Sequence, residues 1–175
     1  KLGALLFQLP PYLRKDLPRL RDFLAVLPPG TPAAFEFRHA SWQDDEVYAA
    51  TADWLERTRK TNKPFFLWFN PTRMHQQIHI APEWMGKSGH SRYADGVLHL
   101  DAIVGKLLKQ LDDMGVANNT IVMFTSDNGV NLAHWPEAGT PAFRGEKGTT
   151  WDGGFRVPML VRWPGKVPAG GWTGE

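Results

Sequence analysis

The sequence TIVMFTSDNGVNLAHWPEAGTPAFRGEKGTTWDGGFRVP, residues 120–158, contains the features around which the rest of the chain is interpreted. Its first part, Thr120–Thr125, is apolar and rich in β-formers, which predicts a buried strand. Asp127 and Asn128 follow where that strand should end, and ligands of open α/β sheets bind outside the carboxyl ends of the strands. A glycine-rich loop, residues 144–154, then carries Lys147, and its glycines should let the backbone come close to a ligand. This arrangement predicts a site that holds a hard cation and an anion together.

The N-terminal region predicts a strand, a helix and a second strand. Residues 4–9 and 33–37 are the two apolar strand candidates, and each is bounded by turn-forming residues. Asp16 is a good N-cap for the helix between them. A further helix should follow, with Ser41 and Asp44 as its capping box. The region therefore predicts one βαβ unit followed by a helix.

The remaining chain continues the α/β pattern. Residues 65–69 and 157–163 are apolar strand candidates. Between them, Asp95 is the predicted cap of a helix that Gly115 ends, with His99 on its polar side. The predicted apolar face of this helix consists of Val97, Leu100, Val104, Leu107, Leu108 and Leu111.

Composition excludes several classes of function. The chain has 175 residues and a net charge of +2, which gives no reason to expect binding to nucleic acid or to an anionic membrane. It has no cysteine, so a disulfide framework, a zinc–thiolate site and a cysteine nucleophile are all excluded. No apolar run is long enough to span a bilayer, and the first residues do not resemble a signal peptide.

Each candidate site residue has a functional and a structural interpretation. Asp127 and Asn128 offer oxygen ligands to Ca²⁺ or Mg²⁺, but Asp-Asn-Gly is also a common turn sequence. Lys147 can hold a sulfate or phosphate oxygen, or it can be an ordinary solvated lysine. His75 can donate a proton or bind an anion. With His79 it also has the spacing of a metal pair on a helix, although the intervening residues are not strongly helical.

Two segments resemble known families. KLGALLFQLPP, LPRLRDFLAVLP and AAFEFRHASWQDDEVYA, within residues 1–50, resemble the N-terminal part of the YecE-like TIM-barrel family of unknown function. KPFFLWFNPTRMH, DAIVGKLLKQLDDMGVANNTIVMFTSDNG and FRGEKGTTWDGGFRVPMLVRWPG, within residues 51–170, are similar to the arylsulfatase family of the alkaline-phosphatase-like superfamily. The expected fold is α/β: a partial sulfatase-like sheet with flanking helices over residues 51–175, preceded by a βαβ fragment of a TIM-barrel-like domain over residues 1–50.

The sulfatase resemblance implies a function and a role for each site residue. Asp127 and Asn128 match two ligands of the family's divalent cation, usually Ca²⁺. Lys147 matches the lysine that holds the sulfate, and His75 matches the histidine beside the ester oxygen, so both are expected to be catalytic and substrate-binding. The resemblance implies a sulfate ester as substrate and a family that is usually periplasmic or secreted, which leaves the location of this chain unknown.

The same resemblance exposes a departure from the family. Sulfatases make a formylglycine nucleophile from Cys or Ser in a Cys/Ser-x-Pro-x-Arg motif, and this chain contains no such motif. Two interpretations follow. In the first, the chain is an incomplete sulfuric ester hydrolase that is inactive by itself. In the second, it is a chimeric fragment with at most residual anion or metal binding, or a YecE-like barrel fragment.

Overall fold

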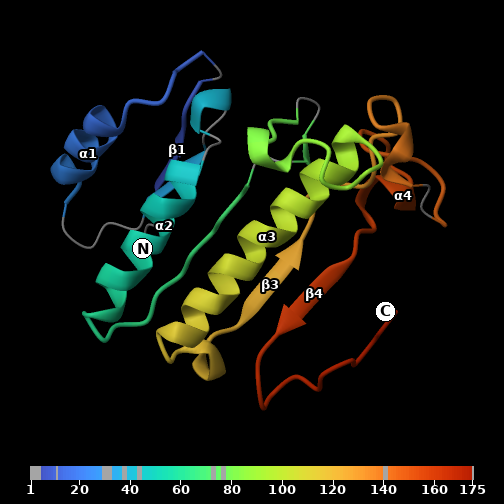
Figure 1. Cartoon of the computed structure of the whole chain (residues 1–175). Helices are drawn as coiled ribbons and strands as arrows, with labels where there is room; N and C mark the ends of the chain where they lie inside the picture. Colours follow the sequence, from blue (N-terminus) through green and yellow to red (C-terminus); the bar gives the residue numbers. More distant parts are fainter. Residues whose placement is uncertain are drawn as a thin grey trace. The chain divides into compact units, whose positions relative to one another are not determined.

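Helices and short strands alternate along the chain in the computed structural model, which confirms the predicted α/β class (Figure 1). The structure describes residues 5–10, 12–28, 33–36, 39–42, 45–71, 74–75, 78–139 and 142–174. The chain divides into two units, residues 1–73 and 74–175, and each is described by itself. The predicted domain boundary at residues 50–51 stays a prediction. One helix of the first unit, α2 (Asp45–Arg59), runs continuously across that position.

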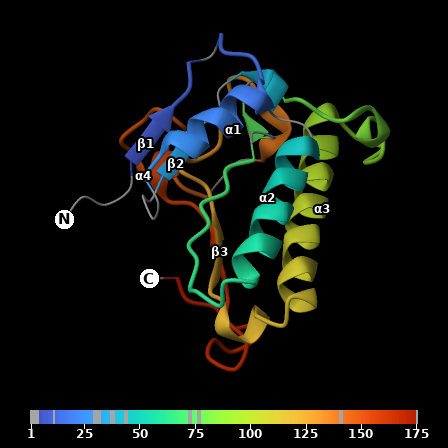
Figure 2. The ribbon, with the colours of Figure 1, turned by 90° about the vertical axis from the view of Figure 1, so that its left-hand side faces the viewer.

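The first unit begins with the predicted βαβ motif. Strands β1 (Leu5–Gln8) and β2 (Ala33–Glu36) pair in parallel, and helix α1 (Leu17–Val26) connects them (Figure 2). The Asp16 carboxylate accepts the Arg19 N–H at 3.0 Å, which confirms the predicted N-cap. The helix packs on the strands through three phenylalanine rings with centroids 4.8–6.0 Å apart, Phe7, Phe23 and Phe35.

A second set of contacts stabilises the segment before α2. The Trp42 side chain lies buried in the 3₁₀ helix η1 (Ala40–Trp42), and its indole N–H donates to the Leu13 carbonyl at 3.0 Å. The Ser41 hydroxyl accepts the Lys15 N–H at 2.6 Å. Ser41 lies in η1, and its predicted capping-box partner Asp44 lies outside the described residues, so the capping box stays a prediction.

The predicted strand at residues 65–69 is wrong. These residues belong to a segment without strand pairing, 63–71, and from residue 64 to 71 the residues alternate between exposed and half-buried. Phe66 is 81% exposed and Trp68 is 73% exposed. A strand exists only where a neighbouring strand accepts its backbone hydrogen bonds, so the alternating pattern alone is insufficient. Trp54 of α2 contacts this segment edge-on at Phe65, with ring centroids 6.2 Å apart.

The second unit is built around a long helix, α3 (Arg92–Asp113). Ser91 caps it by accepting the Ala94 N–H at 3.2 Å, so the predicted cap, Asp95, is wrong. The helix ends as predicted at Gly115, which has a φ of 71°. Its N–H donates to the Asp112 carbonyl, and the next N–H donates to the carbonyl of Leu111, a Schellman motif.

Asp95 lies in the first turn of α3, where it fixes the preceding loop. Its buried carboxylate accepts the N–H groups of Gly86 at 2.7 Å and Ser88 at 2.8 Å. Hydrogen bonds from Ser88, followed by the one from Gly86, lower the pKa of Asp95. The predicted exposed or polar placement of His99 is also wrong. This histidine is 2% exposed, and its ring stacks on Trp84 of the 3₁₀ helix η3 (Pro82–Trp84) at 5.1 Å.

The buried face of α3 matches the predicted one in part. Leu111 is buried and Leu100, Val104, Leu107 and Leu108 are half-buried, whereas the predicted Val97 is 42% exposed. Gly96, His99 and Ile103, which were not predicted, are also buried. Gly96 is on this face because an added Cβ would lie 3.0 Å from Ile78 and 3.3 Å from the Met74 sulfur. The helical periodicity was therefore correct, but polar and small residues occupy part of the buried stripe.

Strands β3 (Val122–Thr125) and β4 (Met159–Arg162) form an antiparallel pair near the predicted positions. Val122 pairs with Arg162 at one end, and Thr125 pairs with Met159 at the other. The predicted burial of the β3 strand is wrong, because Met123 is 60% exposed and Phe124 is also exposed. Two strands have too few neighbours to cover their own apolar side chains. The remaining elements are η4 (Ala117–Asn119), η5 (Pro136–Ala138) and α4 (Asp152–Phe155).

Candidate functional site

The Asp-Asn pair lies where the sequence predicts, directly after β3. Asp127 and Asn128 form a bend, in which the Ser126 hydroxyl donates to the Asn128 carbonyl at 2.9 Å. The Asn128 carboxamide nitrogen donates to the Asp127 carboxylate, so the two side chains lie against each other. Asp127 is exposed and Asn128 is half-buried. The chain therefore bends at Asp127 and Asn128, as expected if Asp-Asn-Gly is a turn sequence. Both polar side chains lie at the end of β3.

The donor set suits a hard cation but is incomplete. A carboxylate and a carboxamide oxygen are ligands that Ca²⁺ accepts, and Ca²⁺ takes about six to eight oxygens. Among the described residues, no group of three or more His, Cys, Asp or Glu side chains could hold a metal ion. Asp127 and Asn128 would therefore supply only part of a coordination shell. Their role as metal ligands stays a prediction.

Backbone hydrogen bonds join the segment after β3 to the loop that carries Lys147. The Lys147 N–H donates to the Val130 carbonyl at 2.8 Å, and the Gly129 N–H donates to the Gly154 carbonyl at 2.8 Å. Within the second loop, the Gly153 N–H donates to the Arg144 carbonyl at 2.7 Å. The half-buried Lys147 is consequently held at a fixed backbone position beside the residues that follow the Asp-Asn pair.

The glycines of this junction serve backbone packing. A Cβ added at Gly129 would lie 1.8 Å from the Gly153 carbonyl oxygen, and one added at Gly154 would lie 2.3 Å from the Thr149 carbonyl oxygen. The sequence predicts that such glycines admit a ligand, but in the structure they admit another stretch of main chain. Two cation–π contacts also lie in this loop. The Arg144 guanidinium lies 3.8 Å from the Trp151 ring centroid, and the Arg156 guanidinium stacks on Phe143.

His75 meets the same segment through its main chain. Its carbonyl accepts the indole N–H of Trp135 at 3.3 Å, while the imidazole is exposed. Trp135 also packs against Tyr93 in the first turn of α3, with ring centroids 5.8 Å apart. Burial, followed by the negative charge of Glu137, raises the pKa of Tyr93.

Residues 127–135 therefore connect all four predicted site residues. They contain Asp127 and Asn128, they accept the Lys147 N–H through Val130, and they reach His75 through Trp135. Within the described part of the chain, the side chains of His75 and Lys147 form no hydrogen bond or ion pair with each other or with the Asp-Asn pair. The structure brings the segments together, and the joint role of these side chains stays a prediction.

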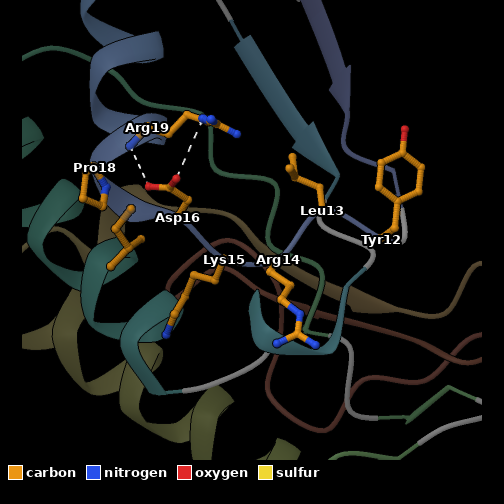
Figure 3. Close-up of a pocket in the computed structure, with 8 residues that line it drawn as sticks. Tyr12, Leu13, Arg14, Lys15, Asp16, Pro18 and Arg19 are labelled. Carbon is orange, nitrogen blue, oxygen red and sulfur yellow. Dashed lines mark hydrogen bonds and ion pairs between the residues drawn. The ribbon is translucent and has the colours of Figure 1, made fainter.

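A separate concavity lies in the first unit. It has a volume of about 570 Å³, is widely open, and is lined by the consecutive residues 12–19 of the first unit (Figure 3). Figure 3 shows the Asp16 carboxylate bound to both the backbone and the guanidinium of Arg19. The segment before α1 and the first turn of α1 form this depression, and none of the predicted site residues lines it. No helix in the described residues is both long and apolar enough to cross a membrane.

Comparisons with known proteins identify relatives of this chain. The family model described as Sulfatase matches residues 15–171. The chain is 38% identical over 128 residues to N-acetylgalactosamine-6-sulfatase of Canis lupus familiaris, covering 71% of this chain and 24% of that protein. It is 42% identical over 127 residues to steryl-sulfatase of Rattus norvegicus, covering 67% of this chain and 21% of that protein.

Solved structures similar to this chain were also found. The crystal structure of PsFucS1 sulfatase from Pseudoalteromonas sp. matches with a TM-score of 0.69 and 34% identity, covering 74% of this chain and 26% of that one. The structure of Ps i-CgsB in complex with k-i-k-neocarrahexaose matches with a TM-score of 0.64 and 28% identity, covering 87% of this chain and 37% of that one.

The extent of these matches bears on the sequence predictions. The predicted resemblance to sulfatases is confirmed, and the matched range begins at residue 15, inside the segment that was predicted to be YecE-like. The YecE-like resemblance stays a prediction. The chain spans about a quarter of the length of the curated relatives that it matches.

Proposed function

This chain belongs to the sulfatase family, and we propose that it carries the cation-binding and sulfate-binding part of a sulfuric ester hydrolase of the arylsulfatase type. The observation that supports this proposal is the junction after β3. There, backbone hydrogen bonds hold the loop of Lys147 against the residues that follow Asp127 and Asn128. The backbone that carries Lys147 is thereby held beside the segment that carries Asp127 and Asn128.

Each predicted residue has a chemical role in this proposal. Asp127 and Asn128 would contribute two hard oxygens to a divalent cation, and we propose Ca²⁺ because it is the usual cation of the sulfatase family that this chain resembles. A bound cation supplies Lewis-acid polarisation of the sulfate oxygens. Lys147 neutralises negative charge on the sulfate group. His75 binds sulfate or protonates the leaving oxygen.

The residues of this chain supply no nucleophile for that reaction. Its serines are Ser41, Ser88, Ser91 and Ser126, and none is followed by the x-Pro-x-Arg sequence that formylglycine formation requires. We therefore expect the purified chain to bind ligands without turnover. Measurable hydrolysis of an aryl sulfate by this chain alone would contradict that expectation.

Calorimetric titration of the full chain with Ca²⁺, and separately with sulfate, tests the binding proposal. We expect Asp127→Ala to abolish Ca²⁺ binding and Lys147→Ala to weaken sulfate binding by about tenfold, because each removes a charged contact. The matched controls are Asp113→Ala and Lys109→Ala, which disrupt an exposed ion pair of 2.6 Å on α3. Both controls should bind like the native chain.

The alternative is a chimeric fragment without catalytic function, favoured by the incomplete donor set and by the absent nucleophile motif. It predicts no saturable Ca²⁺ binding by the native chain, or binding that Asp127→Ala and Asp113→Ala weaken equally. The proposed function predicts that Asp127→Ala abolishes Ca²⁺ binding and that Asp113→Ala leaves it unchanged. The same titrations therefore discriminate between the two functions.

A further inference from the structure

Glu146, the residue before Lys147, makes a contact that the proposed chemistry does not use. One oxygen of its carboxylate accepts the Leu132 N–H at 2.7 Å. Both residues are half-buried, and they are 14 positions apart in the sequence. Hydrogen bonds from an N–H to a carboxylate are roughly twice as strong as neutral ones. This contact is therefore a substantial tie between two loops.

The backbone of Glu146 is itself fixed. Its N–H donates to the Thr149 hydroxyl at 3.2 Å, and that hydroxyl donates to the Glu146 carbonyl at 2.7 Å. The carboxylate therefore reaches Leu132 from an anchored main chain. The next residue, Lys147, donates its own N–H to Val130. The consecutive residues Glu146 and Lys147 thus bind the segment after β3 at Leu132 and at Val130.

This pairing also leaves the lysine available. Within the described residues, Lys147 forms no ion pair, although a glutamate is its neighbour in sequence. The carboxylate is directed to the Leu132 N–H instead. An ammonium group without a carboxylate partner can neutralise an incoming anion.

We propose that Glu146 is a positioning residue: its carboxylate clamps the Leu132 N–H and thereby fixes the loop of Lys147 against the loop of Asp127 and Asn128. This inference rests on the proposed function for its effect on ligands. The clamp itself is a property of the unliganded chain. Its effect should pass through the geometry of the junction, since Glu146 does not have to touch either ligand.

The test compares Glu146→Gln with Glu146→Ala in the full chain. Glutamine keeps an oxygen acceptor at the same distance from the main chain, whereas alanine removes it. Amide hydrogen exchange at Leu132, followed by NMR, reports the clamp directly. We expect Glu146→Ala to reduce the protection of this amide by about tenfold, and Glu146→Gln to restore most of it. The Leu111 amide in α3 is the internal control and should not change.

Ca²⁺ and sulfate titrations of the same variants provide the second readout. We expect affinity to fall in Glu146→Ala and to recover in Glu146→Gln. If neither variant alters Leu132 exchange, or if both reduce it equally, the positioning role is overturned. A native chain that binds neither ligand would refute the proposed function, while exchange at Leu132 would still decide whether the clamp exists. A thermal melt of each variant confirms that it is folded.

Discussion

Replacing Gly129 with alanine should separate the two loops of the junction. The added Cβ would lie 1.8 Å from the Gly153 carbonyl oxygen and 2.8 Å from its carbonyl carbon. Both atoms are main chain, so no side-chain rotation can relieve the contact. Main-chain displacement would also break the hydrogen bond from the Gly129 N–H to the Gly154 carbonyl, which measures 2.8 Å.

The expected cost follows from these two effects. Forcing an extra methyl group into a packed region costs about 1–3 kcal/mol, and losing one backbone hydrogen bond costs about 0.5–1.5 kcal/mol. Gly129→Ala should therefore lower the free energy of unfolding by about 2–4 kcal/mol. This is a large fraction of the ~5–15 kcal/mol that is typical of a folded domain.

Urea unfolding followed by circular dichroism measures this loss. The matched control is Gly105→Ala in α3, where an added Cβ meets no atom within 4 Å. That control should stabilise the chain by about 0.5–1 kcal/mol, because alanine is the better helix former. Native-like stability of Gly129→Ala, within about 0.5 kcal/mol, would refute the reasoning on the junction. So would a Gly105→Ala control that is as unstable as Gly129→Ala.

Three further predictions concern the helices. Asp95→Ala should lower the melting temperature at neutral pH. The pKa of Asp95 is lowered in the folded chain, so its charge stabilises the fold above the unfolded pKa of about 4. The difference from native should shrink as the pH falls from about 4 through the folded pKa. Leu55 is 1% exposed, and Leu55→Ala should cost about 2–5 kcal/mol in urea unfolding; a loss under about 1 kcal/mol would contradict its place in the core. Lys109→Ala removes an exposed pair with Asp113 and should change stability by less than about 1 kcal/mol.

Features encoded within a few residues could be predicted from the sequence. The Asp16 cap and the Gly115 stop each depend on one side chain and its immediate backbone, so local rules suffice. The β3 and β4 strands follow from apolar, β-rich runs. The Asp-Asn pair was placed correctly after β3, because a strand end and a turn sequence coincide there.

Features that depend on distant neighbours could not be predicted in this way. The apolar run at 65–69 has the alternation of a strand, but it lacks a partner and remains an extended segment. His99 was placed on a polar face because histidine is polar, yet stacking on Trp84 makes its burial favourable. The sequence also does not reveal that Lys147 donates to Val130, since a backbone hydrogen bond requires no particular side chain.

The glycines carried a signal that was assigned to the wrong cause. Gly153 and Gly154, in the glycine-rich loop, indicate close approach, and sequence reasoning alone assigns that approach to a ligand. The structure assigns it to main chain that packs against main chain. The distinction matters for function, because a junction held by its own backbone does not need a ligand to form. The Lys147 loop is therefore positioned without a ligand, which is the preorganisation that the proposed cation and sulfate binding would require.

The junction around Lys147 and the β3–β4 pair are stabilised in different ways. Leu160 is 66% exposed, and other apolar side chains of β3 and β4 are exposed as well. In the part of the chain that the structure describes, β3 and β4 pair only with each other, and the unpaired edges favour aggregation. The junction, in contrast, is closed by hydrogen bonds that lie entirely within residues 129–154. Replacing exposed apolar side chains of β3 and β4 with polar ones should therefore improve solubility more than it changes the proposed cation affinity. Altering Gly129 or Glu146 should instead lower that affinity, even in a chain that stays soluble.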